Sequence, residues 1–419
     1  MSHSLRRIPI KLDILTLLAF VITARICCAA MSNLPFFTMT FVFLYGLAFI
    51  GLYLMTRPKI TRLEFSTLAA VGFYTVYCVI QSLLAGKGLF STEPFQAYVM
   101  VFLLFIGIWV SRKPQKLQAA LLMLIFLALI FDHCYSIYVL NLDPDASRAA
   151  AALGTVERSS YDTLQAVGGF GAVYGGISVI LITLYIRKIT DKKDIRKWIA
   201  ILVAILTFVF IVMAGYATAI VLLIFAMALY FGERSKLLSV ILILSAVFLL
   251  IFHEAVGQWL MDIAPNIRYS EIVSEKTADL GEMIKDFEAS GTYDGDKGRW
   301  ARMRWSWDTF LDHPIFGGYA VKGARIGAHS AFLDNLGRFG IVGFAPLFMM
   351  FVFLYKNLME TLKTHEMRSC TRIVFIVYFI VAVLNPAMFS LQVMPLILML
   401  PLAESFRPEE AAPRLEEKD

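Results

Sequence analysis

Long apolar stretches recur along almost the whole chain, and this recurrence limits the fold more than any other feature. A helix that crosses the hydrocarbon core of a bilayer needs roughly 20 apolar residues. Hydrophobic residues make up 59% of the 419 residues and charged residues only 17%, a composition that excludes a soluble globular domain. The sequence predicts an all-α polytopic membrane protein. Twelve candidate spans are 12–31, 34–55, 65–84, 95–110, 117–139, 167–186, 198–213, 217–232, 237–252, 330–355, 373–388 and 390–404.

Basic residues are distributed unevenly between alternate loops of this predicted topology. Cytoplasmic loops of membrane proteins are enriched in lysine and arginine. With the N-terminus inside, the short external loops hold only Lys87, Arg148 and Arg158. We therefore predict that both termini are cytoplasmic, and the net charge of +6 reflects topology rather than nucleic-acid binding. The predicted cytoplasmic loops carry Arg57, Lys59, Arg62, Arg112, Lys113, Lys116, Arg187, Lys188, Lys192, Lys193, Arg196, Lys197, Arg234, Lys236, Lys356, Lys363, Arg368 and Arg372.

These boundaries divide the chain into four regions. Residues 1–252 would contain the first nine transmembrane helices, and residues 253–328 a large external loop. Residues 329–404 would contain the last three helices, followed by a cytoplasmic tail at 405–419. Because long loops in compact proteins are usually functional, we expect the external loop to carry the activity.

The second half of this loop concentrates arginine, histidine and aromatic residues. Apolar residues at helical spacing predict an amphipathic helix over 299–311, which Pro314 and the pair at 317–318 would end. The chain then brings Arg325, His329 and Ser330 to the external mouth of the next span. A structural alternative is that these basic residues only anchor the protein at the lipid headgroups. The apolar face would comprise Trp300, Met303, Trp307, Phe310 and Leu311, with Arg299, Arg302 and Arg304 beside it.

The order and spacing of these residues resemble the signature of the O-antigen ligase and Wzy polymerase superfamily. The residues that carry the resemblance are Gly298, Arg299, the aromatic stretch 305–310, Asp312, His313, Pro314, Gly317, Gly318, His329, Ser330, Leu333, Gly340 and Gly343. The resemblance implies a GT-C-like membrane glycosyltransferase with about 12 transmembrane helices and short helices in its external loop. Such enzymes are metal-independent, use no other cofactor, and act on the external face of the bacterial cytoplasmic (inner) membrane.

The resemblance also implies the substrates and partners. These enzymes transfer a glycan from an undecaprenyl diphosphate carrier to an acceptor glycan at the surface of the lipid bilayer. A polymerase uses another lipid-linked repeat unit as acceptor, whereas a ligase uses lipid A core. A chain-length regulator is a further candidate partner, and no nucleic acid is expected. No nucleotide-binding loop is needed, because the donor arrives already activated.

Two residues receive specific roles from the resemblance. His329 matches the catalytic histidine that acts on the acceptor hydroxyl, and Arg299 matches the loop arginine that binds the diphosphate. The chemistry fits these residue types, because a neutral imidazole accepts a proton and an ionised guanidinium binds phosphate oxygens in a bidentate manner. Arg302 and Ser330 are further candidate substrate contacts.

The turn at 213–219 departs from the family pattern. Many members carry a second diphosphate-binding arginine there, but this turn contains none. Either Tyr216 and Thr218 donate hydrogen bonds instead, or a basic residue from elsewhere replaces the arginine. The candidates for that replacement are Arg158, Arg325 and Arg338, each of which also fits a structural role at the membrane interface.

Two functional alternatives remain open from the sequence. The stretches around 168–176 and 328–343 look closer to capsule and exopolysaccharide polymerases than to lipid A core ligases, which favours a polymerase. The alternative from another class is a flippase for lipid-linked oligosaccharides, which should place ionisable groups near the bilayer midplane. Asp132 and His133 in the fifth span, and Arg25 in the first, either are such groups or lie at wet helix ends.

Overall fold

The computed structural model describes residues 13–143, 146–147, 167–232, 252–266, 299–385 and 390–408, with isolated positions between 235 and 248 and between 274 and 281. Within these ranges the chain is helical and contains no strand. The main helices are α1 (Ile14–Cys27), α2 (Met39–Met55), α3 (Arg62–Leu84), α4 (Thr92–Ser111), α5 (Gln115–Leu142), α7 (Phe170–Ile189), α8 (Ile195–Met213), α9 (Ala217–Gly232), α11 (His253–Ile263), α14 (Arg299–Asp312), α15 (Ala331–Thr361), α16 (His365–Leu384), α17 (Ser390–Met394) and α18 (Leu400–Ala403).

The described helices support a multi-pass α-helical membrane protein. Seven of them, α3, α4, α5, α7, α8, α15 and α16, are long and apolar enough to cross a membrane. Four further predicted spans correspond to shorter apolar helices at 14–27, 40–55, 218–232 and 392–406. Most of the predicted span at 237–252 lies outside the described residues. Because several helices are short, the structure does not confirm the predicted number of twelve.

Polar residues at the starts of α3 and α16 form side-chain caps. The Thr61 hydroxyl accepts the amide of Glu64, and the Glu64 carboxylate accepts the amide of Thr61, which makes a capping box at the start of α3. Thr364 accepts the amide of Met367 at the start of α16. Such caps satisfy amide groups that have no partner within the helix. They explain why α3 and α16 begin several residues before the predicted apolar runs.

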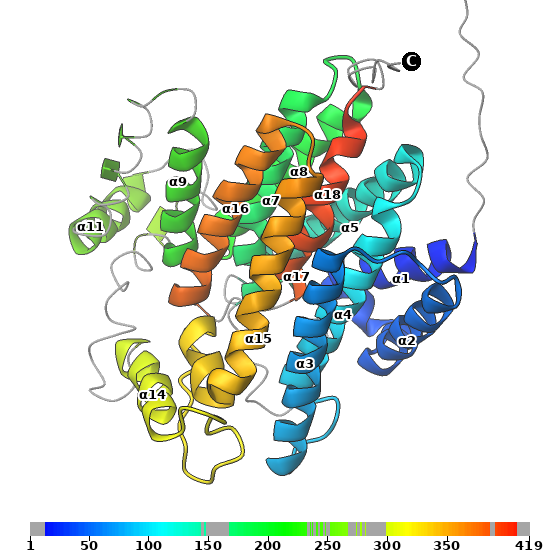
Figure 1. Ribbon diagram of the computed structural model, residues 1–419. Helices are drawn as coiled ribbons and strands as arrows, with labels where there is room; N and C mark the ends of the chain where they lie inside the picture. The colour runs from blue at the N-terminus through cyan, green and yellow to red at the C-terminus, as the bar shows by residue number, and fades with distance from the viewer. Residues whose placement is uncertain are drawn as a thin grey trace, which may run out of the picture.

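The C-terminal segment forms the centre of the bundle (Figure 1). It runs from α17 through a π-helical stretch, Pro395–Met399, into α18, and its side chains from Val393 to Leu400 are almost completely buried. The segment packs against α4, α5 and α7. In a membrane, a segment that is apolar on every side needs no amphipathic pattern to be buried. Sequence periodicity therefore could not distinguish this central helix from the others.

Basic connections from distant parts of the chain gather at one end of the bundle. Arg112, after α4, forms an ion pair with Glu64 of α3. Lys188 in the last turn of α7 and Asp191 just after this helix line a cavity together with Thr364 and Arg407. The α7–α8 and α15–α16 turns and the chain end accordingly lie together at the top of Figure 1. The alternation of basic loops predicted that these turns share the cytoplasmic side of a membrane, and that side stays a prediction.

At the opposite end, the long helix α15 is interrupted near its start. Gly340 has φ 59° and ψ −167°, which is not a helical conformation. In an uninterrupted helix, the amides of residues 341 and 342 would donate to the carbonyls of residues 337 and 338. Instead, the amides of Ile341 and Val342 donate to the carbonyls of Pro314 and Ile315, at 2.9 and 3.1 Å.

The same loop also satisfies the two carbonyls released by the break. The amide of Gly318 donates to the Gly337 carbonyl at 2.8 Å, and the amide of Tyr319 donates to the Arg338 carbonyl at 3.1 Å. Residues 314–319 therefore insert into α15 and replace both missing helical hydrogen bonds. An unpaired amide or carbonyl in lipid costs several kcal/mol. Because the inserted loop pairs these groups, α15 can be broken at Gly340. We call the pairing of residues 314–319 with 337–342 the loop insertion.

Substitution of Gly340 by alanine should destabilise the protein. The glycine occupies a backbone region that side chains rarely adopt, and an added Cβ would lie 2.4 Å from the Ile315 carbonyl oxygen. Backbone strain of this kind costs about 1–3 kcal/mol. We expect a lower melting temperature in detergent for Gly340→Ala, measured by fluorescence-detected size exclusion. Gly51→Ala on α2 is the matched control, because a Cβ there meets nothing within 4 Å. Equal melting temperatures for the two variants would contradict the proposed role of the loop insertion.

Candidate functional site

Helix α14 lies against the start of α15, at the end of the bundle opposite the basic connections (Figure 1). Its bounds agree with the helix predicted at 299–311. The side chains that face the bundle, however, form a mixed stripe of Met303, Ser306 and Thr309. Trp307 and Leu311 of the predicted apolar face are 42% and 57% exposed. Part of the predicted apolar face is therefore exposed, whereas the mixed stripe faces the protein.

Ser306 is the centre of a buried hydrogen-bond network. Its hydroxyl donates to Oδ1 of Asp334 at 2.6 Å and accepts the amide of Gly327 at 2.9 Å. The other oxygen of Asp334, Oδ2, accepts the amide of Ser330 at 3.1 Å. Three segments, α14, the loop at 325–330 and the first turn of α15, are thereby joined through two side chains. Fully satisfied buried networks of this kind rigidify the groups they connect.

The loop before α15 approaches α14 very closely. A Cβ at Gly327 would lie 1.9 Å from the Arg302 carbonyl oxygen, so no larger residue fits there. Thr309 holds the same loop by donating to the carbonyl of Arg325 at 2.8 Å. Ala328 has φ 56°, in the left-handed region that disfavours non-glycine residues. These constraints fix the backbone on both sides of the position from which His329 extends.

Arg302 and His329 are in direct contact. Nη1 of Arg302 lies 3.0 Å from Nε2 of His329. A guanidinium group has only donors, so Nε2 is the acceptor and the imidazole is neutral in this contact. Nε of Arg302 is buried and has no hydrogen-bond partner among the described residues. A fixed cation next to a neutral base, with a spare buried donor, suits the binding of an anion and the acceptance of a proton.

Two other arginine candidates have different surroundings. Arg325 is exposed, and its guanidinium lies 5.7 Å from the centre of the Trp305 ring. Arg338 forms an ion pair with Glu93 of α4, with Nη1 3.3 Å from Oε1. Tyr319 donates to the other oxygen of Glu93 at 2.6 Å. Arg338 therefore joins α15 to α4 in this structure, whereas Arg325 remains close to the site and accessible.

The remaining predicted site residues are Tyr216, Thr218, Ser330, Arg299 and Arg158. Tyr216 lies between α8 and α9, where its hydroxyl donates to the Ser147 carbonyl and its ring packs on that of Phe170; Thr218 follows in α9. Ser330 caps α15 by accepting the amide of Leu333. Arg299 begins α14, but its side chain lies outside the described part of the structure, as does the whole of Arg158.

The ionisable pair of the fifth predicted span is buried rather than at a wet helix end. Oδ1 of Asp132 accepts the amide of Ala29 at 2.7 Å, and the ring of His133 stacks on Phe210 with centroids 5.0 Å apart. Both His133 nitrogens are buried without a hydrogen-bond partner among the described residues, and Nδ1 lies 3.7 Å from Oδ2 of Asp132. Arg25 of α1 donates from Nε to the Phe37 carbonyl. The pair lies in α5, and its described contacts are to segments other than α14 and the loop before α15.

Residues that hold the site together were not identified from the sequence. Ser306 and Asp334 looked like ordinary positions of a helix face and of a helix start. The sequence does carry one signal, because a serine directly before an apolar run suits an N-cap and an acidic residue suits the first turn of a helix; Ser330 and Asp334 occupy these positions. In the described part of the chain, no group of three or more His, Cys, Asp or Glu residues is arranged to hold a metal ion.

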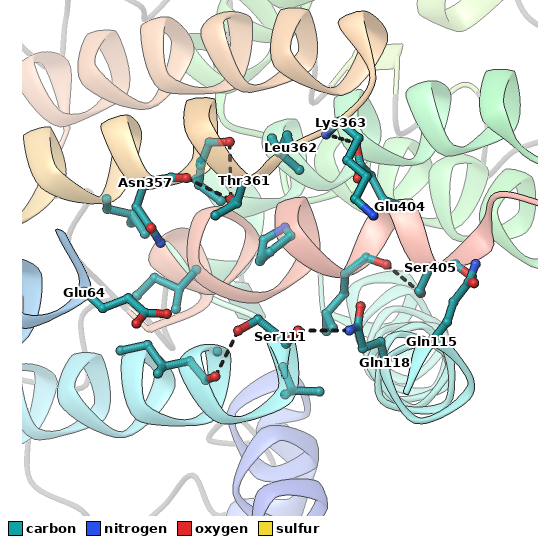
Figure 2. Close-up of a pocket in the computed structure, with 18 of the residues that line it drawn as sticks. Glu64, Ser111, Gln115, Gln118, Asn357, Thr361, Leu362, Lys363, Glu404 and Ser405 are labelled. Atoms are coloured by element: carbon teal, nitrogen blue, oxygen red, sulfur yellow. Dashed lines mark hydrogen bonds between the residues drawn. The ribbon is translucent and has the colours of Figure 1, made fainter. Parts of the chain in front are cut away.

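A cavity of about 580 Å³ lies away from His329, at the end with the basic connections (Figure 2). Its walls come from α3, α4, α5, α15 and the C-terminal segment. Because α15 has 31 residues and starts next to His329, the cavity is about 40 Å from that site along the helix. The cavity is therefore a separate feature and is not the mouth in which His329 and Arg302 meet.

Comparison of the chain with models of known protein families and with curated proteins finds no match. The resemblance to the O-antigen ligase and Wzy polymerase superfamily consequently rests on the motif residues themselves. The structure gives several of these residues a common location, since Pro314, Gly317 and Gly318 belong to the loop insertion with Gly340.

Removal of the Arg338 charge should test whether this residue is structural. Arg338→Gln removes the cation paired with the partly buried Glu93 carboxylate and leaves the Tyr319 hydroxyl as its side-chain donor, so we expect a loss of about 1–3 kcal/mol of stability. The double variant Arg338→Gln with Glu93→Gln should recover much of that loss, because no uncompensated charge remains. Melting temperatures of the two single variants and the double variant measure the coupling. Additive losses would contradict a structural ion pair.

Proposed function

We propose that this protein is a membrane glycosyltransferase that polymerises a lipid-linked glycan. It would transfer the glycan from undecaprenyl diphosphate to the acceptor sugar of another lipid-linked repeat unit. The observation that carries the proposal is the contact of 3.0 Å between Arg302 and His329, at the end of the bundle opposite the basic connections. An anion site next to a neutral base is the pair of functions that this transfer needs.

We also propose the topology expected from the sequence. The protein would be a GT-C-like enzyme of the bacterial inner membrane, with twelve spans and both termini in the cytoplasm. The position of the basic connections supports this orientation, because lysine and arginine accumulate on the cytoplasmic side. The His329 end would then face outward, where the lipid carrier presents its glycan.

In the proposed reaction, the acceptor hydroxyl attacks the anomeric carbon of the donor sugar. The bond between that carbon and the diphosphate oxygen breaks, and undecaprenyl diphosphate leaves with the electron pair. The hydroxyl proton passes to Nε2 of His329. Arg302 and Arg299, with Arg325 at the edge of the site, would stabilise the negative charge that develops on the diphosphate. No metal or nucleotide takes part in these steps.

The Arg302–His329 contact implies that the donor binds before His329 can act as a base. While Arg302 donates to Nε2, that nitrogen has no lone pair left for the acceptor hydroxyl. A diphosphate is a stronger partner for guanidinium than a neutral imidazole is, because its hydrogen bonds are charge-assisted and bidentate. Donor binding would thus draw Arg302 away and make His329 available as a base. The acceptor would be activated only when a donor is present.

A second candidate function is a flippase for the same lipid carrier. The buried Asp132 and His133 within α5 favour it, because ionisable groups inside a membrane often belong to a transport path. The polymerase is preferred because a flippase gives no reason for the rigid arrangement of Ser306, Asp334 and His329 at one end. A ligase that uses lipid A core as acceptor would share the same site.

Replacement of His329 by alanine should abolish polymer growth. Purified protein with undecaprenyl diphosphate repeat units alone should build a ladder of longer products, which gel electrophoresis resolves. Loss of a general base lowers the rate by about 10²- to 10⁴-fold, so His329→Ala should yield no visible ladder at an unchanged melting temperature. His365→Ala, at the opposite end of the bundle, is the matched control and should remain active.

The same assay separates the alternatives. A ladder formed by the folded His329→Ala protein would disprove the catalytic assignment. A product that appears only after addition of lipid A core would identify a ligase. Movement of the carrier across vesicles without glycan growth would identify a flippase.

Replacement of Arg302 by glutamine should weaken use of the donor. Hydrogen bonds to charged groups contribute about 1.5–3 kcal/mol, so kcat/KM for the lipid-linked donor should fall about 10- to 100-fold. Arg304→Gln is the control, because Arg304 lies on the same helix with a side chain that is 80% exposed. Equal kcat/KM values for the two variants would show that Arg302 does not bind the donor.

A further inference from the structure

The cavity of about 580 Å³ at the basic end is drawn in Figure 2, and its lining contains both apolar and polar side chains. Its apolar wall contains Leu104 and Ile108 of α4 and Leu354 and Leu358 of α15, all of which are otherwise buried. Its polar wall lies where the helices end, next to the turn between α15 and α16. Ligand sites in proteins typically enclose about 300–1,000 Å³ and combine an apolar lining with a few polar groups, and this cavity has both properties.

The carboxylates of the polar wall already have partners. Glu64 is paired with Arg112 and accepts the amide of Thr61. Oε1 of Glu404 accepts the amides of Lys363 and Thr364, at 2.7 and 2.9 Å. The charge of Glu64 is offset by a cation, whereas Glu404 keeps its charge and is held by neutral donors. The negative groups serve to fix the α15–α16 turn and the start of α3.

Donor groups of the same wall remain available. The ammonium of Lys363 and the side-chain amide of Asn357 make no hydrogen bond or ion pair within the described part of the chain. Arg407 lines the same wall and carries a further positive charge. The apolar wall extends from these residues along α4 and α15 toward the middle of the bundle. A ligand that satisfies both walls carries an anionic group at one end and an alkyl chain at the other.

We propose that this cavity binds one anionic phospholipid of the surrounding membrane. Its phosphate would lie between Lys363 and Arg407, and one acyl chain would run along Leu104, Ile108 and Leu354. Basic pockets between transmembrane helices on the cytoplasmic side are known to hold anionic headgroups. The acidic tail at 409–419 could satisfy the cations, but it contains few apolar residues and would leave the apolar wall uncovered. The site does not rest on the proposed glycosyltransferase reaction.

Lipid titration of the detergent-purified protein tests the proposal. Native mass spectrometry counts bound lipid, and the melting temperature reports stabilisation by a ligand that binds the folded state. We expect phosphatidylglycerol to bind and stabilise the protein, and phosphatidylcholine to do so much more weakly. Glycerol phosphate, which has the headgroup without acyl chains, should not bind. Equal binding of the two lipids, or binding of glycerol phosphate alone, would overturn the proposal.

Variants locate the binding site. Each lysine or arginine near a headgroup contributes about a five-fold gain in affinity, so Lys363→Gln should weaken phosphatidylglycerol binding about five-fold. Lys363→Gln with Arg407→Gln should weaken it about 25-fold by the same reasoning. Lys116→Gln removes a charge at the same end outside the cavity wall and should leave affinity unchanged. Equal losses for Lys116→Gln and Lys363→Gln would indicate only general attraction to the charged surface and would disprove the site.

A chain that ends at residue 408 tests the tail as the occupant. It should bind phosphatidylglycerol as the full chain does, if lipid fills the cavity. A lipid preference that appears only after this truncation would show that residues 409–419 occupy the cavity, and the proposal would be wrong.

Discussion

The exchange of backbone hydrogen bonds between residues 314–319 and the start of α15 determines most of what lies at that end of the bundle. Gly340 breaks the helix, and the inserted loop satisfies each amide and carbonyl that the break releases. Because the alternative in lipid is an unpaired polar group, loop and helix can hardly move apart. The position of α14, of the loop that follows it and finally of His329 all depend on this exchange.

The lengths of the apolar runs predicted the positions of most described helices, since a backbone in lipid must satisfy its hydrogen bonds within a helix. The resemblance assigned Arg299 and His329 to one site, but the contact of His329 with Arg302 was not predicted. The insertion at Gly340 could not be predicted, because a glycine pair in a span fits simple helix packing equally well. Arg338 was a candidate diphosphate ligand with a structural alternative, and its ion pair could not be predicted because its partner Glu93 lies in a distant part of the sequence.

Helix α15 carries a different kind of polar environment at each end. Near His329, Ser306 and Asp334 are hydrogen-bonded to each other and to the amides of Gly327 and Ser330, and they form a rigid setting for one contact. At the other end Lys363 and Asn357 face an open cavity with an apolar wall. A rigid site suits chemistry on a precisely positioned bond, whereas an adaptable cavity suits a flexible lipid.

The break in α15 also has a consequence for how the protein is made. Synthesis proceeds from the N-terminus, so residues 314–319 leave the ribosome before residues 337–342. Once the second segment enters the membrane, the first is already available to pair with it. Helix α15 therefore need not pass through an intermediate in which its broken hydrogen bonds face lipid alone. A circular permutation that reversed this order of synthesis would expose these groups during membrane insertion, although the finished fold would have the same contacts.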